Sequence, residues 1–162
     1  MKACSLAHLN VPTIDIIKEM GNEKKTNEDN YLEYLSFVKA KQIYGDSLPE
    51  EVSDRLKYEL KIIKHRGSSG YFLFLHDVVN IAQSELGVWI GPGRGSAAGC
   101  LICYCLGITK VDPLRYDLLF ERFLNPDGIL FPDIDIDTDN EGRERIISWL
   151  QQKYGKECCA HI

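Results

Sequence analysis

The stretch 131–139 alternates acidic and apolar residues with a period of two. Side chains on an extended backbone alternate between two faces with that same period. As a strand, the stretch places three acids on one face and two isoleucines on the other: Asp133, Asp135 and Asp137 opposite Ile134 and Ile136. The isoleucines suit a sheet packed on a core. Neighbouring carboxylates repel one another, so they either face water or hold a hard divalent cation such as Mg²⁺ or Mn²⁺.

Length and charge bound the class of protein. The chain of 162 residues suits about one domain with a single core. Its formal net charge is -5, which argues against a free-standing nucleic-acid binder, because such proteins usually carry a basic surface. No apolar run is long enough for a bilayer and no signal-peptide pattern opens the chain, so we expect a cytoplasmic protein without membrane contact. Polar residues at 22–27 predict a linker segment over 1–28, followed by a folded domain over 29–162.

Helical spacing of apolar residues recurs along most of the chain. It predicts helices at about 31–44, 49–66, 71–86, 97–106 and 142–154. A glycine follows each, as is typical where a helix ends in left-handed backbone: Gly45, Gly67, Gly87, Gly107 and Gly155. A short apolar strand is predicted at 88–90.

A glycine-rich turn at 91–99 lies between that strand and the next helix. Free backbone N–H groups at such a turn, beside the positive end of a helix dipole, are suited to phosphate. Arg94 adds a bidentate cation and the Ser96 hydroxyl adds a donor. The Gly-Lys-Ser/Thr ending of a Walker A motif is missing. A turn that only lets a strand and a helix pack closely remains an alternative.

The same turn matches a dinucleotide-binding fingerprint by letter, at Gly93, Gly95 and Ala98. This alternative requires an acid at the end of a second parallel strand about 20 residues further on. Asp112 and Asp117 lie near that distance, but the proline after Asp112 favours a turn.

The acidic stretch and the cysteines have other interpretations. Counted from Asp133, Glu144 stands at the twelfth place of an EF-hand, but Thr138 occupies the place where that calcium loop needs glycine. A solvated edge strand whose charges prevent further strand pairing is another alternative.

Among the six cysteines, Cys100 and Cys103 have the spacing of half a zinc site. No second pair follows, so we interpret the cysteines as free thiols.

A phosphate-binding loop followed by carboxylates is the combination that nucleotidyl transfer requires. The loop holds a triphosphate, and two aspartates hold two metal ions that stabilise the attacking and leaving oxygens.

Several motifs, in order, resemble one family of enzymes. The longest are Gly-Pro-Gly-Arg-Gly-Ser at 91–96, Leu-Phe-Glu-Arg-Phe-Leu-Asn-Pro at 119–126 and Pro-Asp-Ile-Asp-Ile-Asp at 132–137. Together with shorter matches from residue 70 to 155, they resemble the palm of the alpha subunit of bacterial DNA polymerase III, the C-family replicative polymerase. The resemblance covers about residues 30 to 162.

This resemblance implies an α+β fold in which helices pack on a small mixed sheet, as in the nucleotidyltransferase palm of polymerase beta. It implies a site with two groups of residues. Asp133 and Asp135 are two of three catalytic aspartates and bind two Mg²⁺ or Mn²⁺ ions, whereas Gly95 and Ser96 cradle the triphosphate with Arg94 and Arg122 as cationic contacts. The implied partners are primer–template DNA, deoxynucleoside triphosphates and, in the intact protein, other replicase subunits such as the sliding clamp.

The sequence departs from the family pattern in three ways. Gly128 or a neighbour stands where an arginine often follows Asn-Pro, and Cys100 stands where a serine is common. The family polymerases are several times longer, and their third catalytic aspartate lies after the thumb. We therefore expect a partial palm that is inactive by itself. A non-catalytic palm remnant that serves as a scaffold is the remaining alternative.

Overall fold

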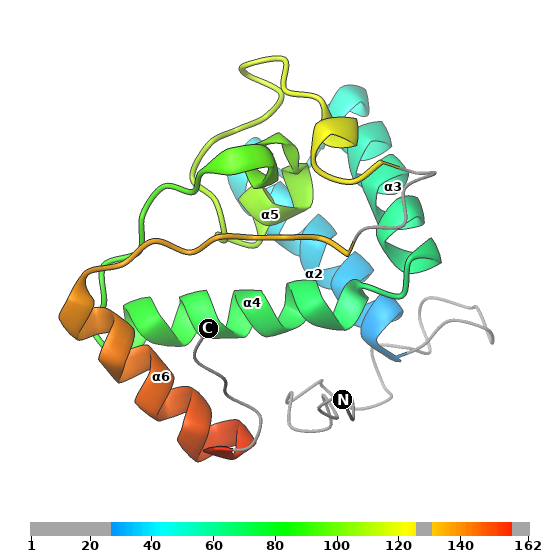
Figure 1. The fold of residues 1–162 in the computed structure, drawn as a ribbon. Coiled ribbons are helices and arrows are strands. Elements are labelled where there is room, and N and C mark those ends of the chain that lie inside the picture. The colour runs from blue at the N-terminus through cyan, green and yellow to red at the C-terminus, as the bar shows by residue number, and fades with distance from the viewer. Residues whose placement is uncertain (1–26, 126–130, 157–162) are drawn as a thin grey trace.

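The computed structural model describes residues 27–125 and 131–156. In this part the chain is mainly helical (Figure 1). The elements are α2 (Asn27–Tyr44), α3 (Glu50–His65), α4 (Ser69–Ser84), η1 (Gly95–Gly99), α5 (Leu101–Cys105), η2 (Phe120–Arg122) and α6 (Asn140–Tyr154), where η denotes a 3₁₀ helix. No helix of the described part is long and apolar enough to cross a membrane.

The helices enclose one main core and a smaller one. Helix α2 packs against α3, α4 and α5, and α3 also contacts α5. The main core is built from side chains of α2 to α5 and η2, among them Leu32, Leu56, Phe72, Leu101 and Phe120, all fully buried. Beyond the end of α4, a second cluster joins Val88 and Ile90 to Ile146 of α6. Figure 1 shows α4 crossing the molecule between α5 and α6.

The predicted helices at 31–44, 49–66 and 71–86 correspond to α2, α3 and α4, so these predictions are confirmed. Gly45 and Gly67 follow α2 and α3 with φ of 96° and 63°, as the glycine stops predicted. The last helix begins two residues before its predicted start because the Asp139 side chain accepts a hydrogen bond from the Gly142 N–H at 2.6 Å. The helix predicted at 97–106 is broken at Cys100 into η1 and α5.

The predicted α+β fold with a small mixed sheet is wrong. Within 27–125 and 131–156, the only strand-like pairing is one isolated antiparallel bridge between Ile90 and Thr138. Figure 1 shows the segment 131–137 crossing the molecule in an extended conformation between α5 and α4. Its Ile134 N–H bonds to a side chain, the Tyr71 hydroxyl, and its Asp137 carbonyl accepts from the Gly91 N–H at 2.9 Å. A strand needs a ladder to a neighbour, whereas period-two alternation reports only which face is buried.

The expected linker at 1–28 lies outside the described residues except at its last two positions, which already belong to α2. Gly128, Cys4, Cys158 and Cys159 also lie outside them. The other three cysteines, Cys100, Cys103 and Cys105, are buried free thiols, as predicted. Burial raises the pKa of Cys105 to about 12, so its thiol stays protonated near neutral pH.

One histidine ties α4 to the end of α5. The Nδ1 atom of His76 lies 2.7 Å from the Leu106 carbonyl oxygen, to which it donates a hydrogen bond. Burial is the main reason that the pKa of His76 falls below its ordinary value of 6.5. The folded chain therefore binds a proton at His76 less readily than the unfolded chain does. The resulting stability is complete above pH 6.5 and is lost as pH falls through that value toward the folded pKa.

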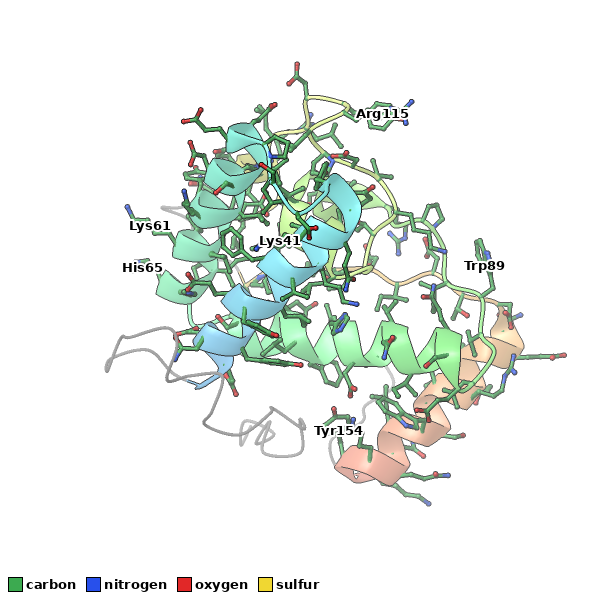
Figure 2. All side chains as sticks on the ribbon, turned by 180° about the vertical axis from the view of Figure 1, so that it is seen from behind. Lys41, Lys61, His65, Trp89, Arg115 and Tyr154 are labelled. Atoms are coloured by element: carbon green, nitrogen blue, oxygen red, sulfur yellow. The ribbon has the colours of Figure 1, made fainter. Side chains whose placement is uncertain are left out.

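We predict that His76→Asn flattens this pH dependence, because the asparagine amide donates to the Leu106 carbonyl from a similar position without titrating. Urea unfolding of both proteins between pH 7.5 and about 5 would measure the difference. His65→Gln is the control, since His65 is exposed and points away from the fold on α3 (Figure 2). Parallel stability curves for the wild type and His76→Asn would contradict the prediction.

Candidate active site

The glycine-rich turn is held by its backbone from two directions. Lys110 donates its backbone N–H to the Pro92 carbonyl at 2.8 Å and its Nζ to the Ile90 carbonyl at 2.9 Å. From the other direction, the Gly91 N–H donates to the Asp137 carbonyl. The turn is therefore fixed by main-chain contacts before any ligand is considered, and the acidic segment supplies one of them.

Two glycines of the turn adopt backbone angles that other residues avoid. Gly93 has a φ of 93° and Gly95 a φ of 66°. A Cβ atom at position 93 would also lie 2.8 Å from the Thr109 Cγ2 atom. The Gly-x-Gly spacing thus meets a geometric need, and the Gly95 and Ser96 side of the turn is exposed.

The acidic segment shows the two faces predicted for it. Asp133, Asp135 and Asp137 are exposed, Ile134 is buried, and Ile136 is partly buried. The carboxylates therefore share the solvent side even though no sheet supports them.

Arg94 joins the turn to the acids. Its Nη1 lies 2.8 Å from Asp135 Oδ2 and its Nε lies 3.0 Å from Asp137 Oδ1. The hydrogen bond with Asp137 and the charge of Asp135 raise the pKa of Arg94. The three side chains remain 42–57% exposed, so solvent screens the attraction. A residue predicted to bind phosphate thus contacts a residue predicted to bind metal.

The other predicted site residues lie around this contact. Asp133 lies two residues before Asp135, and its charge adds to the stabilisation of the Arg94 cation. Ser96 begins the second half of the turn in η1. Arg122 is exposed on η2, which packs against η1, but it forms no ion pair with an acid of the described chain. The structure therefore brings Arg94 and Asp135 together. Arg122 lies on a helix that packs against the glycine-rich turn, but it forms no ion pair with the acids.

The donor atoms at Asp133 and Asp135 fit a hard divalent cation, since both are exposed carboxylates on one face. In the described segments, however, no group of three or more His, Cys, Asp or Glu side chains is arranged to hold a metal ion. Arg94 occupies Asp135 and Asp137 instead. By chemistry two carboxylates are suitable ligands, and a cation would have to displace an arginine from one of them.

The other predicted metal sites are not formed. Glu144, the twelfth place of the EF-hand pattern, lies on α6 and lines a surface hollow of about 340 Å³ with Leu86 and Trp149. Asp139 caps α6. Cys100 accepts the Cys103 N–H at 3.4 Å and donates to Glu59 at 3.3 Å, which are the contacts of a structural thiol.

The dinucleotide-binding alternative also lacks its structural context. The fingerprint requires a strand before the turn and a helix after it. Here the turn leads into the five-residue 3₁₀ helix η1. The Asp112 carboxylate accepts the Leu114 N–H at 3.0 Å and so caps a turn, as the following proline indicated.

Sequence reasoning missed two residues behind the turn, Arg55 and Glu59 on α3. Glu59 is fully buried and accepts hydrogen bonds from the backbone N–H groups of Leu101 and Ile102. Arg55 donates to the carbonyls of Gly99 and Leu118. A signal existed, because Glu59 follows Val52 and Leu56 on the apolar stripe of the helix, where a charge requires a partner.

A family model described as the bacterial DNA polymerase III alpha NTPase domain matches residues 30–162. The chain belongs to this family. It is 46% identical over 131 residues to the DNA polymerase III subunit alpha of Staphylococcus aureus (strain Mu50 / ATCC 700699) and 47% identical over 134 residues to the protein of that name from Halalkalibacterium halodurans. These matches cover 80% and 83% of this chain but 12% of each relative. The resemblance found in the sequence is confirmed.

The close approach of η1 to the segment before η2 yields a stability prediction. A Cβ atom at Gly99 would lie 2.7 Å from the Leu119 carbonyl oxygen, a backbone atom that cannot rotate away. We predict that Gly99→Ala lowers the free energy of unfolding by about 1–3 kcal/mol, the usual cost of overpacking. Urea unfolding measures it, with Ser96→Ala as the control because that side chain is exposed. Equal stability of Gly99→Ala and the wild type would show that the two segments are not in contact.

Proposed function

We propose that this chain forms part of the nucleotidyl-transfer site of a template-directed DNA polymerase. Family membership supports the parent activity, and the contact of Arg94 with Asp135 and Asp137 is the observation that carries the site. In this proposal Gly95 and Ser96 cradle the triphosphate of a deoxynucleoside triphosphate, and Arg94 and Arg122 neutralise its charge. Asp133 and Asp135 hold two Mg²⁺ or Mn²⁺ ions. The proposed polymer partner is primer–template DNA, and other replicase subunits such as the sliding clamp are partners of the intact polymerase.

In this proposal the glycine-rich turn positions the triphosphate, whereas Arg94 supplies positive charge. The turn presents exposed backbone at Gly95 and Ser96, where N–H groups can donate to phosphate oxygens without moving. Arg94 supplies two donors in a fixed fork, which suits either a carboxylate or a phosphate. Bound divalent ions would stabilise the charge that develops on the attacking and leaving oxygens.

Arg94 and a metal ion compete for Asp135. Both are cations that bind the same exposed carboxylate, so occupancy by one lowers the affinity for the other. A metal ion held by Asp133 and Asp135 would displace Arg94 from Asp135, and the Arg94 guanidinium would then be available to the triphosphate. Arg94 thus acts as a counter-ion to Asp135 and Asp137 and limits the mutual repulsion of the acids.

We predict that Arg94→Gln tightens the binding of Mn²⁺ by about two- to fivefold, the range expected for loss of one exposed ion pair, while weakening the binding of dATP. Paramagnetic broadening of amide signals in a titration with Mn²⁺ would measure the first effect, and the broadening should centre on Asp133 and Asp135. Arg122→Gln is the matched control: it should weaken dATP binding but leave Mn²⁺ binding nearly unchanged, because Arg122 forms no ion pair with Asp133, Asp135 or Asp137.

Three outcomes of this titration separate the proposals. Broadening at the two aspartates together with dATP binding supports the polymerase site. Binding of NAD without dATP would favour the dinucleotide interpretation, against the structural context described above. Neither broadening at millimolar metal nor dATP binding would identify a non-catalytic scaffold.

We further predict that the 162-residue chain shows no primer extension by itself. A two-metal site needs carboxylates on both ions, and within 27–125 and 131–156 no group of three or more His, Cys, Asp or Glu side chains is arranged to hold metal. The assay uses a labelled primer–template with all four deoxynucleoside triphosphates and Mg²⁺, with an intact bacterial replicative polymerase as the positive control. Template-dependent extension by this chain that Asp133→Asn abolishes would overturn the prediction.

A further inference from the structure

Arg55 links three segments that are distant in sequence. Its Nη2 donates to the Gly99 carbonyl at 2.9 Å and to the Leu118 carbonyl at 2.9 Å, and its Nε donates to Glu59 Oε1 at 2.8 Å. Gly99 ends η1, and Leu118 lies just before η2. Figure 1 shows η2, in yellow, between α3 and the pair formed by η1 and α5. One guanidinium thus connects α3 to both segments.

Glu59 completes the connection on the side of α5. Its Oε1 accepts the Leu101 N–H at 2.9 Å, and its Oε2 accepts the Ile102 N–H at 3.0 Å. The Cys100 thiol donates to Oε2 at 3.3 Å. Burial raises the pKa of Glu59, and the two N–H groups and Arg55 oppose that rise. Every polar contact of this buried carboxylate is therefore directed at residues 100–102 or at Arg55.

These contacts fix the orientation of the backbone more than they raise the net stability of the fold. Burial of a charged pair costs desolvation free energy, and apolar side chains of similar size often stabilise a fold equally well. Hydrogen bonds, in contrast, select particular atoms at particular angles. The atoms selected here belong to the two segments that carry Ser96 and Arg122, both of which the proposed function assigns to one triphosphate.

We infer that Arg55 and Glu59 are positioning residues for the nucleotide: they set the distance between the glycine-rich turn and Arg122 so that one triphosphate meets both. This inference rests on the proposed function. Neither side chain contacts the ligand in this scheme. Arg55 is 19% exposed and Glu59 is fully buried, so both act through the backbone that they hold.

The pair explains a break that helical periodicity did not predict. The backbone at Cys100 is extended, with φ of -99° and ψ of 115°, and this separates η1 from α5. Glu59 accepts the N–H groups immediately after the break, while Arg55 binds the carbonyl immediately before it. The break therefore has a partner on each side, and the turn is presented at an angle that a continuous helix would not allow.

Arg55→Lys tests the inference. An ammonium group can still pair with Glu59, but as a point charge it does not hold both carbonyls in the geometry of a fork. We expect the affinity for dATP in Mg²⁺ buffer, from amide shifts in an NMR titration, to fall about tenfold or more, as expected when binding groups are displaced. Amide hydrogen exchange should accelerate at 95–102 and 118–122 while α4 stays protected.

Two further variants complete the design. Lys57→Arg makes the reverse exchange on the same helix, at an exposed residue paired with Asp54, and should change neither dATP affinity nor exchange. Glu59→Gln keeps the shape of the side chain but places an amide N–H₂ group against donors. It should accelerate exchange mainly at 100–102, and it provides a second test if Arg55→Lys does not fold.

The outcomes are distinguishable. Wild-type dATP affinity in a folded Arg55→Lys variant, or a fall in thermal midpoint with no local change in exchange, would overturn the inference and leave the proposed function standing. Failure of the wild-type chain to bind dATP at millimolar concentration would overturn the proposed function and this inference with it.

Discussion

The partly buried ion pair of Arg55 and Glu59 is the interaction on which the arrangement of the candidate site depends. Short 3₁₀ helices and a five-residue α-helix have little stability of their own, since helix formation repays its entropic cost only over longer segments. Elements of this size keep a fixed orientation only when another part of the molecule binds their exposed N–H and C=O groups. Helix α3 does so with one carboxylate and one guanidinium, and it is itself long enough to pack firmly in the core.

Breaking the exposed ion pairs of Arg94 costs much less free energy than breaking the pair of Arg55 and Glu59. Exposed pairs contribute roughly 0–1 kcal/mol, far less than the cost of leaving a buried charge unpaired. Arg94 is therefore easily exchanged for another cation, whereas Arg55 is not. The same residue type thus has two roles a short distance apart in the fold: one arginine fixes backbone, and the other balances charge that a ligand can take over.

Much of the local structure could be predicted from sequence, whereas the fold class could not. Helices α2, α3 and α4 match the predicted ranges, the apolar stripe of α3 is the clearest of the signals, and the two faces of 131–137 follow from alternation alone. The sheet was wrongly predicted because alternation indicates burial on one side and carries no information about a pairing partner. The break at Cys100 depends on Glu59, 41 residues earlier, and no local pattern can report such a contact. The contact of Arg94 with Asp135 was equally hidden, although both are predicted site residues.

The two halves of the site therefore differ in how they are held. The glycine-rich turn is fixed by main-chain bonds to Lys110 and Asp137 and by the conformations of Gly93 and Gly95. Salt screens none of these strongly, because they are short and are made by the backbone. The carboxylates, in contrast, are arranged by charge at the surface, where added ions weaken every attraction. In the proposed function, the glycine-rich turn would hold phosphate and keep its shape while the number of cations at the neighbouring acids changes. This difference would suit the proposed reaction, because the turn would hold the triphosphate in one orientation while Asp133 and Asp135 would exchange their cations.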